Sequence, residues 1–272
     1  MMRPLRCLLV ILLLLPFFAP CPGRAAEPPA TIPGTGDSQE LLRLLARAFA
    51  KSHPGPAIEI PDSIGTSGGI KAVLADRATV ARVARPPKEK EQQAQLHYEV
   101  FAHSPVVFTT SPTVKGLRGL TYPQITAIYG GRITNWQEIG GPEATIYVMN
   151  REEGDSSRTV LEAVIPGFKE ITPVGERIYT TPEAVKTLRT YPDTIGYLPL
   201  SALRGSGLVP LAVNGVAARE ETVRNGRYPL TVPFGFVWKE TPQGRVREFL
   251  RFIRSEAGRK LLRANGAVPA EQ

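Results

Sequence analysis

Three polar or glycine-rich loops, each leading into a predicted helix, are the parts of this sequence best suited to chemistry. They lie at residues 34–38, 65–69 and 154–158. The first turn of a helix leaves backbone N–H groups without partners, and the helix dipole makes that end partly positive. Such an end binds phosphate-like anions; glycines allow close approach to the backbone, and hydroxyl groups add donors. Three converging ends could therefore replace most of the hydration shell of an oxyanion.

Three arginines, Arg85, Arg151 and Arg158, lie close to these loops in the sequence. A guanidinium group donates two parallel hydrogen bonds to an oxyanion. Each feature also has a purely structural interpretation, because a glycine-rich loop can be a simple turn and a surface arginine a solvated charge. We expect Asp37 and Asp155 to be helix caps first and ligand acceptors second. The combination of loops, rather than any single loop, indicates an anion site.

Strand-like and helix-like patterns alternate along the chain, which favours an α/β fold. The predicted strands are 58–60, 80–84, 101–110, 145–149, 194–198 and 228–238. The predicted helices follow the three loops and also cover 121–128, 182–188 and 245–264. Thr121 and Gln124 have the spacing of a capping box. We interpret residues 26–33 as a flexible lead, and Trp136 and Trp238 as core or hinge packing.

The composition is that of a globular protein, with 42% hydrophobic and 21% charged residues in a chain of 272. This length allows two modest lobes or one large domain. The formal charge is +8, and it falls to +5 once Arg3, Arg6 and Arg24 of the first 25 residues are removed. Basic residues are spread along the chain, whereas nucleic-acid-binding proteins gather them in a stripe with aromatic residues. The excess fits an anionic ligand or merely a basic surface.

The N-terminus has the pattern of a secretory signal. Arg3 and Arg6 precede an apolar run at 7–19, and prolines and small residues follow it. We expect a signal peptide over 1–25, cleaved after Ala25, and export to the periplasm. A retained anchor helix and a lipid anchor at Cys21 are the alternatives.

Cysteine and histidine usage argues against metal sites and disulfides. The two cysteines, Cys7 and Cys21, both lie in the predicted signal, so the mature chain is expected to have no thiol. The histidines at 53, 97 and 103 match no metal-ligand spacing. We therefore expect no cofactor and no metal.

A longer sequence pattern surrounds the three loops. Its most specific stretch is IYGGRITNW at 128–136, and the other segments are GTSGGIK (65–71), REEGDSS (151–157), IGY (195–197), YPL (228–230) and NGAVP (265–269). These segments, which span nearly the whole mature chain, resemble the phosphate-binding proteins of ABC-type phosphate uptake systems. In that family, GTSGGIK is similar to the second phosphate loop and REEGDSS to the Arg-x-x-Gly-Ser-Gly-Thr loop.

The resemblance implies a two-lobed periplasmic-binding-protein fold of type II, the Venus-flytrap fold, with mixed sheets and crossover hinge strands. The expected crossings lie near 101–107 and 228–236. Lobe 1 would then comprise 27–104 with 232–272, and lobe 2 would comprise 105–231. The ligand would lie in the cleft between the lobes.

The resemblance also implies a receptor that captures inorganic phosphate, or a similar oxyanion, for an ABC transporter. Its partners would be the oxyanion and the permease subunits in the membrane, with no nucleic acid, and the protein would be a monomer. The candidate ligand-binding residues are Thr35, Gly36, Asp37, Ser38, Thr66, Ser67, Gly68, Arg85, Arg151, Asp155, Ser156 and Ser157.

The sequence departs from the family pattern at its loops. Asp155 and Ser156 replace a hydroxyl residue and a glycine, Ala84 replaces a serine, and Asp37 precedes Ser38 where a small residue and a threonine are common. An acid repels a fully ionised anion but accepts a hydrogen bond from a protonated one. Phosphate carries a proton near neutral pH and sulfate does not. We therefore hypothesise that Asp37 or Asp155 accepts the phosphate proton and helps to reject sulfate.

Two other classes of function are compatible with parts of this sequence. One is a sensing or protein-interaction module on the same scaffold, with altered or lost phosphate binding, which the changed third loop favours. The other is an enzyme. Ser104 and His103 are neighbours on a predicted strand and would point to opposite faces, Glu152 and Glu153 lie in a polar loop, and no G-x-S-x-G motif occurs. We therefore predict that the protein is not an enzyme.

Overall fold

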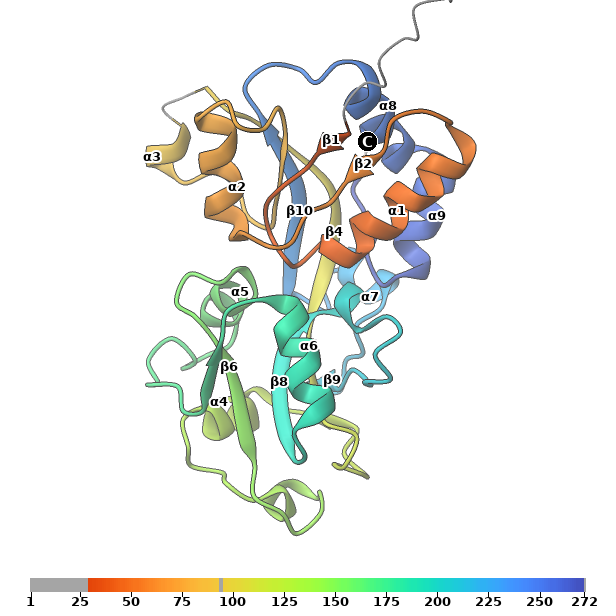
Figure 1. Ribbon diagram of the computed structural model, residues 1–272. Coiled ribbons are helices and arrows are strands. Elements are labelled where there is room, and N and C mark those ends of the chain that lie inside the picture. Colours follow the sequence, from red (N-terminus) through yellow and green to blue (C-terminus); the bar gives the residue numbers. More distant parts are fainter. Residues whose placement is uncertain (1–28, 93–94, 272) are drawn as a thin grey trace, which may run out of the picture.

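The computed structural model describes residues 29–92 and 95–271, and the chain forms two lobes joined by two long strands (Figure 1). The predicted signal peptide lies outside these residues. The helices of the upper lobe in Figure 1 are α1 (Gln39–Ser52), α2 (Gly65–Leu74), α3 (Glu89–Gln92), α8 (Gly244–Arg254) and α9 (Glu256–Ala264). Those of the lower lobe are α4 (Tyr122–Tyr129), α5 (Ser156–Val164) and α6 (Thr181–Thr190), with α7 (Glu220–Arg224) near the junction.

One mixed sheet runs through both lobes. Its order is β3 (Ala81–Val83), β10 (Thr231–Trp238), β4 (His97–Thr110), β8 (Thr194–Pro199), β6 (Tyr147–Arg151) and β7 (Glu176–Ile178), with β11 (Val268–Pro269) also paired to β4. Strands β6, β7 and β8 pair in parallel, whereas β4 is antiparallel to β8, β10 and β11. The predicted two-lobed α/β fold with mixed sheets is confirmed.

Strand β4 connects the lobes. Its residues 97–105 pair with β10, and its residues 106–110 pair with β8. The strand thus exchanges one neighbour for another at the junction between the lobes (Figure 1). The predicted crossing segments, 101–107 and 228–236, fall largely within β4 and β10. The exact residue boundaries of the two lobes stay a prediction.

Smaller elements complete the fold. They are the pairs β1 (Ala30–Thr31) with β2 (Ile58–Glu59) and β5 (Gly119–Leu120) with β9 (Ala212–Val213), and the short 3-10 helices η1 (Trp136–Ile139) and η2 (Leu200–Leu203). Within the part of the chain that the structure describes, no helix has the length and apolar character needed to span a bilayer.

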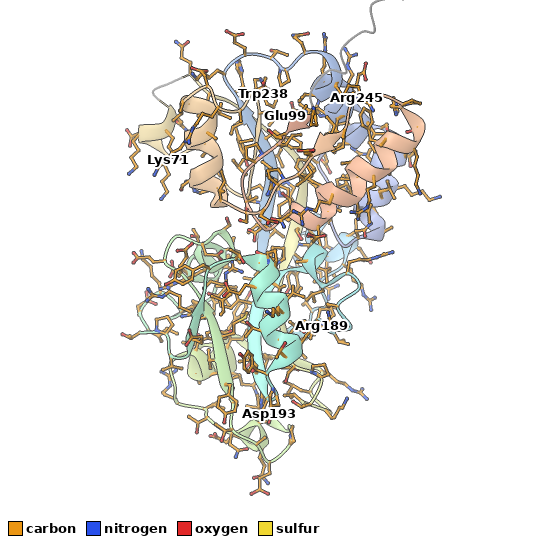
Figure 2. All side chains as sticks on the ribbon, viewed as in Figure 1. Lys71, Glu99, Arg189, Asp193, Trp238 and Arg245 are labelled. Atoms are coloured by element: carbon orange, nitrogen blue, oxygen red, sulfur yellow. The ribbon has the colours of Figure 1, made fainter. Side chains whose placement is uncertain are left out.

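Each lobe has an aromatic core. In the upper lobe the rings of Phe49 and Phe249 lie 5.4 Å apart, and in the lower lobe the rings of Tyr129 and Tyr197 lie 5.4 Å apart. Trp136 is fully buried, as predicted, and its indole N–H donates to the carbonyl of Asp193 at 3.0 Å. Figure 2 shows Asp193 at the end of the lower lobe that is farthest from the junction.

The capping box predicted at the start of α4 is confirmed, because Thr121 accepts from the backbone of Gln124 and Gln124 accepts from that of Thr121. The single long helix predicted over 245–264 is wrong. Ser255 ends α8 and caps α9 by accepting from the N–H of Gly258 at 3.3 Å. A side chain at Gly258 would collide with the carbonyl of Phe252, so the glycine allows this tight break.

Two further predictions about local structure are wrong. Residues 65–69 are the first turn of α2 rather than a loop before it, and tertiary contact fixes this turn because the hydroxyl of Thr66 accepts from the N–H of Ala84 at 3.1 Å. The end of the predicted flexible lead is held by β1, and Ile32 is fully buried. In addition, β6 extends to Arg151, two residues beyond the predicted strand.

Candidate functional site

Four helix N-termini meet at one pocket between the lobes. Helices α1 and α2 approach it from the upper lobe, and α5 and α6 from the lower lobe. The pocket has a volume of about 170 Å³. Its lining residues are Thr35, Gly36, Asp37, Ser63, Ile64, Gly65, Thr66, Ser67, Arg85, Arg151, Glu152, Gly154, Asp155, Ser156, Tyr179, Thr180 and Thr181. All three predicted loops therefore lie together at this pocket. The N-terminus of α6 also lines it, which the sequence analysis did not predict.

The first loop is held in place by Arg82, which is fully buried on β3. Its guanidinium donates to the carbonyl groups of Thr35 at 2.7 Å and Pro61 at 2.7 Å, and also to that of Ile32. Burial lowers the pKa of Arg82 to about 10, so the group stays charged at neutral pH. Gly34 lies against this strand, where a Cβ would stand 1.9 Å from the carbonyl oxygen of Arg82. The loop can therefore approach the strand only with glycine at this position.

We predict that Arg82→Gln lowers the free energy of unfolding by about 3 kcal/mol or more, because several buried carbonyl groups lose their charged donor. In a chain of this size the midpoint of thermal unfolding should fall by roughly 6–12 °C. Arg77→Gln changes an exposed arginine and is the matched control. Thermal unfolding measured by circular dichroism checks this, and a fall no larger than that of the control would contradict the structural role of Arg82.

Asp37 is the most unusual residue of the site, because its carboxyl group is buried between the lobes with only 4% of the residue exposed. Its Oδ1 accepts from the hydroxyl of Thr181 at 2.5 Å, whereas its Oδ2 has no hydrogen-bond partner. Burial, reinforced by the neighbouring carboxylate of Asp155, raises the pKa of Asp37 to about 6, against the lowering effects of Arg151 and of the nearby hydroxyl groups of Thr181 and Ser156. The free oxygen is therefore a buried acceptor that is costly to leave without a donor.

The raised pKa of Asp37 predicts how the stability of the ligand-free protein depends on pH. The folded protein holds this proton more tightly than the unfolded chain, whose ordinary pKa is 3.8. The associated stability is fully present below that value and is lost as the pH rises through about 6. The stability of wild type relative to Asp37→Asn should thus fall by about 2 kcal/mol between about pH 4 and about pH 7. Urea unfolding in phosphate-free buffers checks this, and a difference that is constant or rises with pH would contradict it.

Arg151 ends strand β6 and is almost fully buried, with 3% exposed. Its Nη2 donates to Oδ2 of Asp155 at 2.7 Å and its Nη1 to the hydroxyl of Thr181 at 3.4 Å, but its Nε has no partner. Asp155 caps α5 through its other oxygen, which accepts from the N–H of Arg158 at 3.1 Å. The cap predicted at Asp155 is confirmed, and both of its carboxylate oxygens are occupied. The cap predicted at Asp37 is wrong, because Ser38 is the N-cap of α1 and the carboxylate of Asp37 turns to Thr181 instead.

The third guanidinium group of the region, Arg85, lies on the upper-lobe side of the pocket. It donates to Ser67 at 2.9 Å and to both carboxylate oxygens of Glu91, at 2.8 and 3.2 Å. These hydrogen bonds hold the pKa of Glu91 below its usual value. Arg158 does not line the pocket; its guanidinium pairs with Glu162 at 2.6 Å and donates to the carbonyl of Arg151 at 3.2 Å. Arg151 is therefore the deepest cation of the pocket.

Buried polar atoms without partners gather at this site. Within residues 29–92 and 95–271, five such side-chain atoms occur, and four belong to Asp37, Ser38, Arg151 and Ser157. Three of the four residues supply donors, namely one guanidinium N–H and two hydroxyl groups, and the fourth supplies a carboxylate acceptor. Buried groups of this kind are normally satisfied, so their concentration indicates a bound molecule. A small oxyanion that carries one proton matches three donors and one acceptor.

Nine of the twelve candidate ligand-binding residues line the pocket. Ser38, Gly68 and Ser157 do not, although the unpartnered hydroxyl groups of Ser38 and Ser157 are buried beside it. The contribution of each residue to binding stays a prediction. Sequence reasoning missed the N-terminus of α6, whose cap Thr180 accepts from the N–H of Glu183. Thr180 and Glu183 have the same spacing as the capping box that was recognised before α4.

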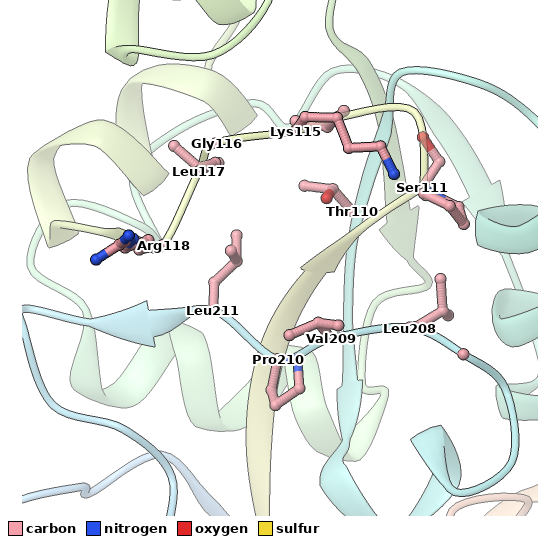
Figure 3. A pocket seen from close by; sticks show the side chains of 13 residues that line it. Thr110, Ser111, Lys115, Gly116, Leu117, Arg118, Leu208, Val209, Pro210 and Leu211 are labelled. Carbon is pink, nitrogen blue, oxygen red and sulfur yellow. The ribbon is translucent and has the colours of Figure 1, made fainter.

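A larger cavity, of about 430 Å³, lies in the lower lobe between residues 110–118 and 207–211 (Figure 3). Its lining residue Ser111 pairs with Thr113 at 2.9 Å, and none of the five buried side-chain atoms without partners in the described residues belongs to its lining. None of the cavity's lining residues belongs to the pocket between the lobes. The unsatisfied groups thus distinguish the smaller pocket, not the larger one.

Comparison with known proteins agrees with this geometry. The chain is 25% identical to the phosphate-binding protein PstS of Bacillus subtilis over 244 residues, which is 88% of this chain and 80% of the relative. It is 26% identical to PstS of Borreliella burgdorferi over 216 residues, 75% and 77% of the two chains. A candidate phosphate ABC transporter substrate-binding protein from Clostridium perfringens, solved with bound phosphate, superposes with a TM-score of 0.78 at 28% identity and covers 90% of this chain and 100% of its own.

The sequence profile of the PBP superfamily domain matches residues 22–257, which is most of the chain. Together with the two-lobed fold and the pocket between the lobes, this match means that the protein belongs to the PBP superfamily.

Proposed function

We propose that the protein is an extracytoplasmic receptor that captures inorganic phosphate, or a closely similar oxyanion, between its lobes for an ABC transporter. The observation that carries the proposal is the set of four unpartnered buried groups beside a pocket bounded by four helix N-termini. Partial positive charge at these helix ends and the guanidinium of Arg151 favour an anion. Relatives named for phosphate binding, and the phosphate in the Clostridium perfringens protein, support the same ligand.

The two acids of the pocket have different roles in this proposal. Both oxygens of Asp155 are occupied, one by the backbone of α5 and one by Arg151. Asp37 keeps Oδ2 free, so it is the residue that accepts the proton of a protonated oxyanion. Sulfate, which has no proton, would place an oxygen against this carboxylate and is disfavoured. Asp37 thus becomes the specificity residue of the site.

We infer that the protein acts as a monomer in the periplasm, that its closed form docks on permease subunits in the membrane, and that it binds no nucleic acid. A purely binding role is supported by the environment of Ser104, whose hydroxyl donates to Ser201 at 3.2 Å in the interior. Among the described residues, the hydrogen-bond partners of this hydroxyl are the side chain and the N–H of Ser201, and His103, its neighbour on the strand, points to the other face.

A sensing or protein-interaction role is the second candidate, and one observation favours it. Asp155 and Thr181 already occupy Nη2 and Nη1 of Arg151, so the guanidinium is partly committed to protein acceptors. If Arg151 kept these contacts in the presence of an oxyanion, the protein would not bind the oxyanion and could bind a partner protein instead.

Calorimetric titration separates the two candidates. The purified protein is freed of bound ligand by partial unfolding and dialysis, refolded, and titrated with phosphate and then with sulfate at neutral pH. The receptor proposal expects one phosphate per chain and sulfate binding weaker by at least about 100-fold, because a buried acceptor discriminates strongly against a ligand without a donor. Absence of heat with any oxyanion would reject the receptor and favour the second candidate.

A further inference from the structure

Thr181, the first residue of α6, occupies a position that none of the site predictions included. It lies in the lower lobe, and only 2% of the residue is exposed. Its hydroxyl donates to Oδ1 of Asp37 at 2.5 Å and accepts from Nη1 of Arg151 at 3.4 Å. One hydroxyl group thus joins the buried cation to the buried carboxylate.

The Thr181 contact crosses between the lobes. Asp37 precedes α1 in the upper lobe, and 144 residues separate it from Thr181 in the sequence. The backbone approach is close here as well, because a Cβ added to Gly36 would lie 3.3 Å from Cδ of Pro182. The contact also stands between two cavities, the pocket of about 170 Å³ and another of about 230 Å³, and Gly36, Asp37 and Thr181 line both. Opening of the lobes at this point would have to break the Asp37–Thr181 hydrogen bond.

The Thr181 hydroxyl also decides which oxygen of Asp37 is available. Because Oδ1 is occupied by this donor, the carboxyl group is oriented with Oδ2 unpartnered. A short hydrogen bond from a hydroxyl to a carboxylate is among the stronger neutral-to-charged contacts, and burial strengthens it further. The closed arrangement and the acceptor for the ligand are therefore set by the same side chain.

We propose that Thr181 is a positioning residue that holds the two lobes closed through the Arg151–Thr181–Asp37 chain and thereby presents Oδ2 of Asp37 to the ligand. The link between the lobes follows from the geometry of this chain of hydrogen bonds, whereas the presentation of Oδ2 to a ligand rests on the proposed phosphate-binding function.

The test measures the separation of the lobes in the ligand-free protein. Spin labels are attached at Lys71→Cys in the upper lobe and Tyr191→Cys in the lower lobe, both exposed positions. Native Cys7 and Cys21 lie within the predicted signal and are replaced by serine in the labelled protein. Thr181→Val removes the hydroxyl while keeping the shape of the side chain, and Thr181→Ser keeps the hydroxyl and is the matched control. Pulsed electron resonance then gives the distribution of distances for each protein.

We expect one short distance in wild type and in Thr181→Ser, and a population shifted about tenfold or more toward longer distances in Thr181→Val. If Thr181→Val does not fold, Thr181→Ala, which admits water to the two partners, replaces it. Identical distances in wild type and in the variant without the hydroxyl would overturn the inference about closure.

Phosphate and sulfate titrations of the same proteins test the part that concerns the ligand. The preference for phosphate over sulfate should fall by about tenfold in Thr181→Val and be restored in Thr181→Ser, a rescue that general loss of packing would not produce. An unchanged preference in Thr181→Val would overturn this part. If wild type itself bound no phosphate, the proposed function would fail, while the distance measurement would still decide whether Thr181 links the lobes.

Discussion

Arg151→Gln is expected to weaken phosphate binding by at least about 30-fold. The Arg151 side chain is almost fully buried, and its Nε is one of the unpartnered donors at the pocket. Removing one member of a buried, hydrogen-bonded charge pair costs about 2–5 kcal/mol or more, which corresponds to losses of roughly 30-fold to several thousand-fold. Glutamine keeps an N–H donor but removes the charge, and it also leaves Asp155 without its cation.

The control for this substitution is Arg158→Gln. Arg158 lies on the same loop-to-helix segment and does not line the pocket; its guanidinium pairs with Glu162 and touches only the backbone carbonyl of Arg151, not its guanidinium. Its substitution should change phosphate affinity by less than about threefold, because partly exposed ion pairs contribute little. Calorimetry gives both affinities, and circular dichroism confirms folding. If the folded Arg151→Gln protein bound phosphate as well as the control does, Arg151 would not be a ligand.

Asp37→Asn is expected to change the preference between phosphate and sulfate by at least about 100-fold, in favour of sulfate. The amide would keep its oxygen toward Thr181 and place an N–H donor where Oδ2 lies. That N–H group can donate to a fully ionised ligand oxygen, so the site no longer requires a proton on the ligand. A site that hydrogen-bonds one particular group of its ligand discriminates by several orders of magnitude against ligands that lack this group. Converting the acceptor of Asp37 into a donor should therefore change the phosphate-to-sulfate preference strongly.

Asp155→Asn is the comparison variant for Asp37→Asn. Asparagine is a good N-cap, so its one oxygen can keep the bond from the N–H of Arg158, although its NH2 group would then face Arg151. Neither oxygen of Asp155 is free to accept from a ligand in wild type. Its phosphate-to-sulfate preference should stay within a few-fold of wild type. A change at Asp155→Asn as large as that at Asp37→Asn would mean that the wrong acid has been assigned the acceptor role.

In wild type, sulfate should compete better as the pH falls below about 6, where Asp37 becomes protonated and can donate.

The sequence located the loops of this site because their signals are local. Glycine and hydroxyl residues before an apolar helical pattern mark a helix N-terminus wherever they occur, and the segments around 34–38 and 154–158 follow this rule. The resemblance across 128–136 supplied the two-lobed fold, which no single loop could specify. The caps at Thr121 and Asp155 were predictable for the same local reason.

Other parts of the site depend on contacts between distant residues. Arg82 looks like any strand arginine in the sequence, and only the fold shows that it is buried beneath the first loop. Thr181 meets Asp37 across 144 residues, so no spacing rule connects them. The sequence also left two acids as candidate proton acceptors. Geometry separates them, because the cap and Arg151 use both oxygens of Asp155 and leave Oδ2 of Asp37 free.

The most direct test of the central claim is a crystal structure of the protein grown with saturating phosphate at neutral pH. We predict one phosphate in the pocket between the lobes, within about 2.6–3.2 Å of Nε of Arg151, Oδ2 of Asp37 and the hydroxyl groups of Ser38 and Ser157. Density for phosphate at another position, such as the cavity of Figure 3, or no bound phosphate at all, would contradict the assignment of this pocket as an oxyanion site.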